Sequence, residues 1–566
     1  MEALARSLGY VYAEDFTAAL DHARRAVHAL FVEVTGGATA IATEETPEQR
    51  LAARVAAGES DDLAEEAGRV LGVRDADGAA QHLRRLARRP EHPLGAAVHA
   101  REPEVGAKLL AEIRDAPDPD MALAHLADLF ERVHPADRYA RRLVEDPARA
   151  RGLVGLMGSS EHLARALLAR PALLDTVVAR GAPPSVEEVR GWVRDALARA
   201  RGADPEDTDA ALGAIRRAMR EISVALGVAV VAGALDVAEV TARLTALAEA
   251  VLHACLALAS EEMCQRYGAP GDDPLSGVVV VGLGSLGAGE LGWGADLDLL
   301  FVHAHDAPTR GGPRGAVSAG EYAVRLAQRT LSLLSVPHGE GDGYATDTRL
   351  RPAGSQGTLV VSRGAFARYH AEAAASWERQ ALLRARVVAG DAAFGEAVGA
   401  LVASIAYGRG PADLDELRRL RARMELELGR EDRGALALKH GRGGLVDVEF
   451  AVQALQMAHG GDPRVRTPNT RAAIHALASL GHLTPEEHEA LDEGERLLRG
   501  VILAARLATL RGGLLPSSPT AVTVARAMGY RDRVERTALE GLLGDIARAR
   551  DNARRAFRSV LARLAG

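Results

Sequence analysis

The sequence of 566 residues carries a net charge of −8 and is 48% hydrophobic, 4% aromatic and 26% charged. Its length predicts several domains, and its acidic balance argues against a protein whose main partner is nucleic acid, because phosphate neutralisation requires a basic surface. Cys255 and Cys264 are the only cysteines, which excludes a disulfide framework and zinc-finger spacing and fits a reducing cytoplasm.

The first half of the chain has the spacing of helices. Residues 1–120 alternate Ala-, Leu- and Arg-rich stretches with breaks, and residues 35–49 (TGGATAIATEETPEQ) are predicted to form a loop or linker. Residues 121–267 are again helical in pattern, and we expect Ser159 or Ser160 to cap one of these helices.

Nothing in the sequence indicates a membrane segment. No charged region followed by an apolar core opens the chain, and the uncharged stretch at residues 222–235 (ISVALGVAVVAGAL) is too short to span a bilayer. We therefore expect a cytoplasmic protein without a membrane partner.

Residues 278–303 (VVVVGLGSLGAGELGWGADLDLLFVH) are the most informative segment: an apolar strand, a glycine-rich turn and a second strand with two aspartates. Because strand side chains alternate between faces, Asp296 and Asp298 should share one face while Leu297 and Leu299 point into the core. Two carboxylates on one face repel each other unless a cation lies between them. Hard oxygen ligands at this spacing suit Mg²⁺.

The glycine turn offers a second half for such a site. Gly284 and Ser285 provide unhindered backbone N–H groups and a hydroxyl for a triphosphate, although Gly282, Gly284 and Gly287 also match the G-x-G-x-x-G dinucleotide fingerprint. That fingerprint requires a crossover helix and an acid about 20 residues later, whereas only eight residues separate Gly287 from Asp296. The spacing favours a short helix or turn. If the glycines are considered without the two aspartates, a glycine-rich loop that binds no ligand is the alternative interpretation.

A third carboxylate is predicted to come from residues 343–362 (GYATDTRLRPAGSQGTLVVS). Asp347, Arg349 and Arg351 would share one strand face at a period of two. A structural salt bridge is the simpler interpretation. Next to a metal and a triphosphate, we instead expect Asp347 to complete the metal ligands and the arginines to bind phosphate oxygens.

A scaffold helix is expected between the second strand and this segment. Ser318 and Glu321 have the spacing of a capping box, and Tyr322, Leu326 and Leu333 follow on one helical stripe.

Gly-Ser followed eleven residues later by Asp-Leu-Asp is the pattern of polymerase-beta-like nucleotidyltransferases. More specifically, residues 278–391 resemble the adenylyltransferase half of bacterial glutamine synthetase adenylyltransferase/adenylyl-removing enzymes. The matching strings are GLGSLGAGELGWGADLDLLFVH, DTRLRPAGSQGTLVVS and WERQALLRARVVAGD, and GRGGLVDVEFAVQ (residues 441–453) resembles the family's helical-domain signature. The resemblance implies an α+β fold: a mostly helical chain with one small mixed-sheet nucleotidyltransferase domain, followed by a helical bundle.

The expected organisation has four parts. They are a helical N-terminal region (1–120), a helical region preceding the catalytic domain (121–267), the nucleotidyltransferase domain (268–400) and a C-terminal helical bundle (401–566).

The two ends of the chain echo each other. LARSLGY (residues 4–10) resembles VARAMGY (524–530), and DHARRAVHAL (21–30) resembles DNARRAFRSV (551–560). Coincidence between Ala- and Arg-rich helices is one interpretation. The other is that the first 35 or so residues resemble the closing helices of a first half whose catalytic domain is missing, so that a single activity is expected.

The resemblance implies transfer of AMP from ATP to a tyrosine hydroxyl of glutamine synthetase, which regulates nitrogen assimilation. It also implies a PII-type signalling protein and glutamine as effectors. Asp447, where the removing half usually has Arg-Glu, and the Gly-Trp-Gly after Leu291 favour the transferring half. The reverse, phosphorolytic adenylyl-removing reaction and a non-catalytic module that binds glutamine synthetase or a PII protein are the alternatives.

In the implied mechanism, Asp296, Asp298 and Asp347 hold two Mg²⁺ ions that bridge the ATP phosphates. The backbone of Gly284 and the hydroxyl of Ser285 hold the β- and γ-phosphates. Asp347 is the expected general base for the tyrosine hydroxyl. Arg349 and Arg351 are expected to contact phosphate oxygens and complete the site.

The chain also departs from the family pattern. It has Ser285 where the family commonly has lysine, Ala288 in place of glycine and Ala295 in place of serine. A degenerate regulatory pseudoenzyme is therefore a further alternative.

Three charged residues of the helical signature have no assigned role in this scheme. Two interpretations fit Lys439, Asp447 and Glu449 equally well. One is a regulatory or interdomain contact, and the other is capping and packing at a helix that begins at Gly-Gly.

Overall fold

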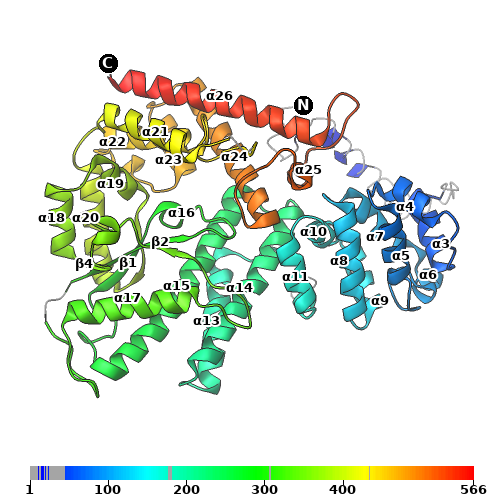
Figure 1. Ribbon diagram of the computed structural model, residues 1–566, viewed down its shortest axis with the longest axis horizontal. Coiled ribbons are helices and arrows are strands. Elements are labelled where there is room, and N and C mark those ends of the chain that lie inside the picture. The colour runs from blue at the N-terminus through cyan, green and yellow to red at the C-terminus, as the bar shows by residue number, and fades with distance from the viewer. Residues whose placement is uncertain are drawn as a thin grey trace. The chain divides into compact units, whose positions relative to one another are not determined.

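The computed structural model describes residues 11, 15–17, 19–20, 23–24, 45–175, 182–304, 307–431 and 434–565. The protein is 66% helical, and five strands form one small mixed sheet (Figure 1). This confirms the predicted α+β class. Of the predicted N-terminal echoes, residues 4–10 and all but two residues of 21–30 lie outside the described part.

The chain divides into two compact units. The first comprises Met1–Gly181, Gly227–Ala234 and Ser518–Leu543, and the second comprises Ala182–Leu226, Leu235–Ser517 and Gly544–Gly566. Two of the boundaries between them fall within helices, namely α14 (Thr208–Val231) and α26 (Ala538–Ala565).

The described part of the first unit is built from short helices. They are α3 (Pro47–Ala56), α4 (Leu63–Leu71), α5 (Ala76–Leu86), α6 (Ala96–Arg101), α7 (Pro103–Asp115), α8 (Pro119–Arg132), α9 (Ala136–Glu145), α10 (Pro147–Met157), α11 (Glu161–Ala169) and α25 (Pro519–Ala527). Prolines at first helical positions and aspartate caps such as Asp118 and Asp146 begin several of them. Because α3 begins at Pro47, the loop predicted at residues 35–49 ends earlier than expected.

The second unit contains the sheet and longer helices. Its helices are α13 (Val186–Ala203), α15 (Val237–Tyr267), α16 (Gly284–Ala288), α17 (Ala319–Ser335), α18 (Arg363–Glu372), α19 (Ser376–Ala381), α20 (Ala392–Tyr407), α21 (Leu414–Leu428), α22 (Leu445–Ala458), α23 (Thr470–Ser479) and α24 (Pro485–Thr509), with 3₁₀ turns η1 (Gly354–Gln356), η2 (Leu382–Arg384) and η3 (Pro463–Val465).

The sheet is centred on two antiparallel strands, β1 (Val278–Gly282) and β2 (Leu297–His303). β1 also pairs antiparallel with β5 (Arg386–Gly390), while β2 pairs in parallel with β3 (Thr346–Asp347) and β4 (Val360–Ser362). Every residue of β1 is buried, which explains its unbroken run of valines, since a strand covered on both faces needs no polar alternation.

Helices cover both faces of the sheet (Figure 1). On one face, a buried cluster joins alternate residues of β1 and β2 to α18 and α20; it includes Val281, Leu300, Phe366 and Val402. The intervening strand residues are buried on the opposite face, where α17 packs against β2, β3 and β4, and α15 packs against α17 and β5. The sheet is therefore a rigid base for the loops at its edge.

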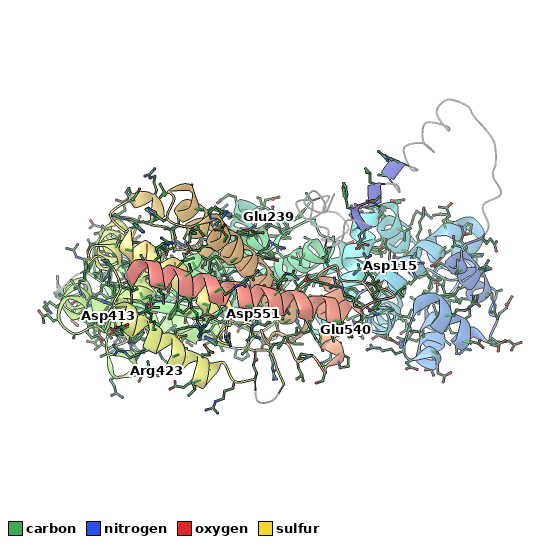
Figure 2. All side chains as sticks on the ribbon, turned by 90° about the horizontal axis from the view of Figure 1, so that it is seen from above. Asp115, Glu239, Asp413, Arg423, Glu540 and Asp551 are labelled. Carbon is green, nitrogen blue, oxygen red and sulfur yellow. The ribbon has the colours of Figure 1, made fainter. Side chains whose placement is uncertain are left out.

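A second cluster forms the core of the C-terminal bundle of this unit. It joins α21, α22, α23, α24 and the later part of α26 through residues such as Leu417, Leu455, Ile474 and Phe557. Figure 2 shows Asp413 at the beginning of α21 and Arg423 farther along that helix. The Asp413 carboxylate caps α21 by accepting hydrogen bonds from the backbone N–H groups of Asp415 and Glu416.

Two predicted helix starts are confirmed. Ser160 caps α11, accepting a hydrogen bond from the backbone N–H of Leu163. Ser318 caps α17 through the N–H of Glu321 at 3.1 Å, and Tyr322 is fully buried on the predicted scaffold stripe.

One described helix, α15, is long and apolar enough to cross a membrane by length and composition, and 72% of its most apolar window is buried inside the protein. Burial of this kind is also found in core helices, so the apolar sequence of α15 is explained by packing.

Candidate functional site

The glycine turn directly follows β1 and forms the short helix α16, as the spacing predicted. Gly284 begins this helix with a φ of +54°, a conformation that favours glycine. A Cβ at this position would lie 2.2 Å from Oδ2 of Asp298. Gly284 therefore lets the turn approach the carboxylate directly.

The two aspartates of the second strand are placed as the alternation predicted. Leu297 and Leu299 are fully buried, whereas Asp296 is exposed immediately before β2 and Asp298 is half-buried within it. Burial raises the pKa of Asp298, and the charge of Asp347 raises it further. The ionised Asp298 carboxylate is thus a destabilised anion that a cation would stabilise.

The third predicted carboxylate lies on the neighbouring strand. β3 runs parallel to β2, with Asp347 in register with Asp298. The Asp347 carboxylate accepts hydrogen bonds from the backbone N–H of Arg349 at 2.8 Å and from its Nε at 2.9 Å. The hydrogen bonds from the Arg349 side chain, the largest effect, lower the pKa of Asp347.

The prediction that Asp347, Arg349 and Arg351 share a strand face is wrong, because β3 ends at Asp347 and a turn follows. Arg349 folds back onto Asp347 with 80% of its side chain exposed. Arg351 donates to the carbonyl oxygens of Thr348 at 2.8 Å and Gly357 at 3.1 Å. Arg351 therefore fastens the loop.

The residue types around Asp298 fit a divalent ion, but their side chains do not form a complete coordination site. Among the residues that the structure describes, no three His, Cys, Asp or Glu side chains converge closely enough to hold a metal ion. Asp296, Asp298 and Asp347 supply hard oxygen donors at one strand end, as Mg²⁺ prefers. Sharing an ion would require the Asp347 carboxylate to turn away from Arg349.

A cavity of about 340 Å³ opens beside these residues in the second unit. Gly284, Ser285, Asp298 and Lys439 line it together with a group of apolar side chains. The apolar group consists of Leu350, Trp377, Ala381, Leu420, Met424, Leu445, Phe450, Ile502 and Leu503. The cavity thus combines a charged region with an apolar one.

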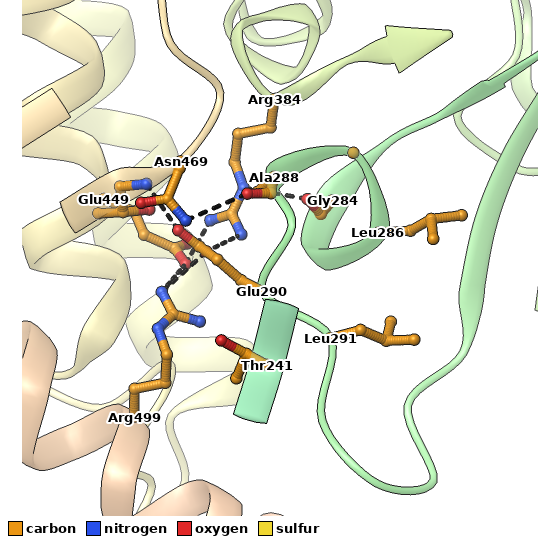
Figure 3. Close-up of polar contacts among 12 residues, drawn as sticks. Thr241, Gly284, Leu286, Ala288, Glu290, Leu291, Arg384, Glu449, Asn469 and Arg499 are labelled. Carbon is orange, nitrogen blue, oxygen red and sulfur yellow. Dashed lines mark hydrogen bonds and ion pairs between the residues drawn. The ribbon is translucent and has the colours of Figure 1, made fainter. Parts of the chain in front are cut away.

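At the wall of the cavity, buried charges form a network that links the sheet domain to the helical bundle (Figure 3). Nη2 of Arg384 lies 2.6 Å from Glu290, and Nη2 of Arg499 lies 2.8 Å from the same carboxylate. Arg384 also pairs with Glu449, and Arg499 pairs with Glu495. Burial opposes the charged form of Glu449, yet the neighbouring arginines, Arg384 first, outweigh it and lower its pKa.

This network touches the glycine turn itself. Nε of Arg384 donates to the carbonyl oxygen of Gly284 at 3.2 Å, and the side-chain amide of Asn469 donates to the carbonyl oxygen of Ala288 at 3.3 Å (Figure 3). Arg384 of η2 therefore holds the first end of α16, and Asn469 of the helical bundle holds the last.

Two of the unassigned charges in the helical signature prove to be buried packing contacts. Asp447 is fully buried, pairs with Arg421 and Arg554, and accepts from the backbone N–H of Gly443. Glu449 belongs to the network of Arg384. Lys439 differs, since it is exposed and lines the cavity.

Sequence reasoning gave no role to Trp377, Arg384 or Glu290. Trp377 and Arg384 lie within WERQALLRARVVAGD, a string that resembles the family but has no spacing pattern that indicates a role for either residue. Glu290, as the sole charged residue between Val278 and Ala295, was the available signal that a cation would be buried against the glycine turn.

Comparisons with known proteins agree with this geometry. Residues 150–400, which include all five strands and the three aspartates, match the family model described as glutamate-ammonia ligase adenylyltransferase. Residues 418–561, within the helical part, match the model described as GlnD PII-uridylyltransferase.

Curated relatives share one description, bifunctional glutamine synthetase adenylyltransferase/adenylyl-removing enzyme. The protein of Xanthomonas axonopodis pv. citri is 36% identical over 427 residues, which cover 74% of this chain and 44% of the relative. The protein of Nitrosococcus oceani is 32% identical over 527 residues, which cover 89% of this chain and 54% of the relative. The chain thus spans about half the length of the adenylyltransferase relatives that it matches, and the resemblance seen in the sequence is confirmed.

Proposed function

We propose that the protein transfers AMP from ATP to a tyrosine hydroxyl of glutamine synthetase and so regulates nitrogen assimilation. The observation that carries this proposal is the register of Asp298 with Asp347 beside Gly284, at the charged end of the cavity. The cavity volume lies in the range of small-molecule sites, which runs from about 300 to 1,000 Å³. The adenylyltransferase family match over the same residues supports the choice of reaction.

ATP would lie along the cavity with its phosphates at the glycine turn. Backbone N–H groups near Gly284 and the Ser285 hydroxyl would hold phosphate oxygens. The adenine would occupy the apolar region, where Trp377, with 39% of its surface exposed, offers a ring for stacking.

Mg²⁺ would be held by Asp296, Asp298 and Asp347, and when bound it would neutralise charge on the phosphates and on the leaving pyrophosphate. Arg349 would release Asp347 as the site fills, and it would then be free to contact a phosphate oxygen, as predicted for this arginine. Arg351 would keep the loop in place through its carbonyl contacts.

In the transfer step, the tyrosine oxygen would form a bond to the α-phosphorus while the bond from that phosphorus to the pyrophosphate oxygen breaks. The proton of the tyrosine hydroxyl would pass to Asp347. The contact with Arg349 lowers the pKa of Asp347 and weakens it as a base, and release from Arg349 would remove that effect and free the carboxylate oxygens for the proton. Positioning of the two reactants would contribute most of the acceleration.

The partners follow from the same proposal. Glutamine synthetase would be the protein substrate, and a PII-type protein and glutamine would act as effectors in the cytoplasm. The match of residues 418–561 to a family described by its action on PII supports a PII-type partner.

The test is transfer of AMP by the purified protein with ATP, Mg²⁺ and glutamine synthetase, read from the intact mass of the synthetase subunit. We expect an added AMP with the wild-type protein and none with Asp298→Asn. Transfer at the wild-type rate by Asp298→Asn would refute the site.

The printed names of the relatives also support a second candidate, the adenylyl-removing reaction. In that case, phosphate would strip AMP from modified synthetase and release ADP, while ATP would add none. Binding to glutamine synthetase with neither reaction would indicate a regulatory module.

A further inference from the structure

Lysine is scarce in this chain, and one of its two lysines lines the candidate site. Of the 69 basic residues, only Lys108 and Lys439 are lysines; the others are arginines. Lys108 lies on the exposed side of α7 and pairs with Glu104 one helical turn away at 2.8 Å, an ordinary surface contact. Lys439 precedes α22 and lines the cavity beside Gly284, Ser285 and Asp298.

The scarcity points to a requirement that arginine does not meet. Arginine serves as the cation almost everywhere else in this protein, in surface pairs and in buried networks alike. A lysine ammonium is a compact point charge with three rotatable donors, whereas a guanidinium is a broad planar fork. A position beside phosphate oxygens is one at which this difference in the shape of the cation matters.

The cavity needs a cation for a polyanionic ligand. Residues 278–303, which contain the glycine turn and two of the aspartates, include no lysine or arginine. Two of the other cations that line the cavity, Arg384 and Arg499, are paired with buried glutamates. Nη1 of Arg506 donates to the carbonyl oxygen of Trp293 at 2.9 Å.

Among the described cations that line the cavity, the ammonium of Lys439 is the one left for a ligand. It makes no hydrogen bond or ion pair with any residue of the described part of the chain. Its charge nevertheless acts on Asp298, where it opposes the rise in pKa, and on Glu449, where it helps to lower the pKa. The ammonium thus lies within electrostatic range of the metal-binding carboxylates and of the buried network.

We propose that Lys439 binds the β- and γ-phosphates of the nucleotide as a point charge. The helical part of the chain thus supplies a cation to a glycine turn that contains no basic residue. This inference rests on the proposed function, since it takes ATP as the occupant of the cavity. The AMP portion of the nucleotide does not touch Lys439.

The test compares two nucleotides that differ in these phosphates. Calorimetry with Mg²⁺ measures binding of an ATP analogue with a methylene group between the α- and β-phosphorus atoms, and binding of AMP. Lys439→Ala should weaken the triphosphate by about 10- to 100-fold, as expected for a hydrogen bond to a charged group, and should change AMP affinity by less than about twofold. Lys439→Arg should recover only part of the triphosphate affinity because of the shape of the guanidinium.

Two further variants serve as controls. Lys108→Ala removes the other lysine and should bind both nucleotides as the wild-type protein does. Trp377→Ala should weaken both nucleotides by the same factor, because it would contact the base that they share. Urea unfolding of each variant checks that its fold is intact. If Lys439→Ala unfolds at a lower urea concentration than the wild-type protein, Lys439→Gln replaces it.

The outcomes separate this inference from the proposed function. Equal loss of both nucleotides in Lys439→Ala, or triphosphate binding within twofold of the wild type, overturns the role of Lys439 while leaving AMP transfer intact. Failure of the wild-type protein to bind the triphosphate or to transfer AMP overturns both.

Discussion

Gly284 shows how one residue sets the geometry of the site. Its positive φ and the 2.2 Å approach of a hypothetical Cβ to Asp298 leave no room for a side chain. The sequence predicted a phosphate turn here from backbone access alone. The structure adds that the same glycine also brings the turn against the carboxylate.

Gly284→Ala should therefore abolish nucleotide binding, since the new methyl group must displace the Asp298 carboxylate. Gly289→Ala is the matched control, because Gly289 also has a positive φ, of +74°, but has open space around its missing side chain. Both variants should lose about 1 kcal/mol from the unfavourable φ, as measured by urea unfolding. Comparable nucleotide affinity in the two variants, measured by calorimetry, would contradict this account.

Asp298 is predicted to trade stability for ligand binding. Its folded-state pKa is raised, so its ionised form destabilises the fold above that pKa, and the penalty disappears as the pH falls below the ordinary value of the group. Asp298→Asn should thus raise the melting temperature of the nucleotide-free protein at neutral pH and remove any stabilisation by Mg²⁺ with the ATP analogue.

The pH of the scan supplies the control for that prediction. The difference in melting temperature between the wild type and Asp298→Asn should shrink as the pH falls through the raised pKa of Asp298. A variant that melts below the wild-type protein at neutral pH would show that Asp298 is stabilising and would refute the assignment.

At the residue scale, the aspartates were predictable and the arginines were not. The alternation of Asp and Leu fixes the faces of β2 wherever the strand lies. The assignment of Arg349 and Arg351 failed because it assumed a longer β3, and the end of a two-residue strand depends on pairing with β2 rather than on its own pattern. Hydrogen bonds such as those of Arg351 to loop carbonyls leave no periodic signal in the sequence.

At the scale of elements, the buried network is the structure that joins α16, η2, α22 and α24. Removing one partner from a buried pair leaves an uncompensated charge in a poorly solvated place. The network also holds the glycine turn through the Gly284 carbonyl, so its loss should affect both stability and nucleotide binding.

Glu449→Gln should lower the free energy of unfolding by about 3 to 5 kcal/mol, the usual cost of breaking a buried ion pair. Asp415→Asn, which removes an exposed pair with Arg418 on α21 of the same unit, should cost less than about 1 kcal/mol. Urea unfolding followed by circular dichroism measures both. Equal costs would show that the Glu449 pair is not a buried structural contact.

Element boundaries were predicted best where local chemistry sets them. Ser160 and Ser318 were identified as caps because a side-chain oxygen before an apolar stripe suffices. The order of the sheet was not predictable, because the pairing of β2 with β3 and β4 joins segments about 50 and 60 residues apart through packing. The same limit applies to Glu290 and Arg384, whose partners lie on distant helices.

At the scale of the whole molecule, the chain combines a small mixed sheet with a helical part that supplies Lys439, Glu449 and Arg499 to the surroundings of the cavity. The family resemblance was carried by three strings in the sheet domain, and the family match over residues 150–400 confirms that resemblance. The contribution of the helical part to the cavity could not be predicted, since it depends on the tertiary packing that brings residues of α22 and α24 to the cavity within the second unit.

The central claim is that Asp296, Asp298 and Asp347 hold Mg²⁺ around a bound nucleotide. A crystal structure with Mg²⁺ and the methylene analogue of ATP tests it most directly. We expect oxygen atoms of Asp298 and Asp347 about 2.0 to 2.1 Å from the ion, with Asp347 detached from Arg349. A nucleotide bound elsewhere, or Asp347 still paired with Arg349 in the filled site, would contradict the account.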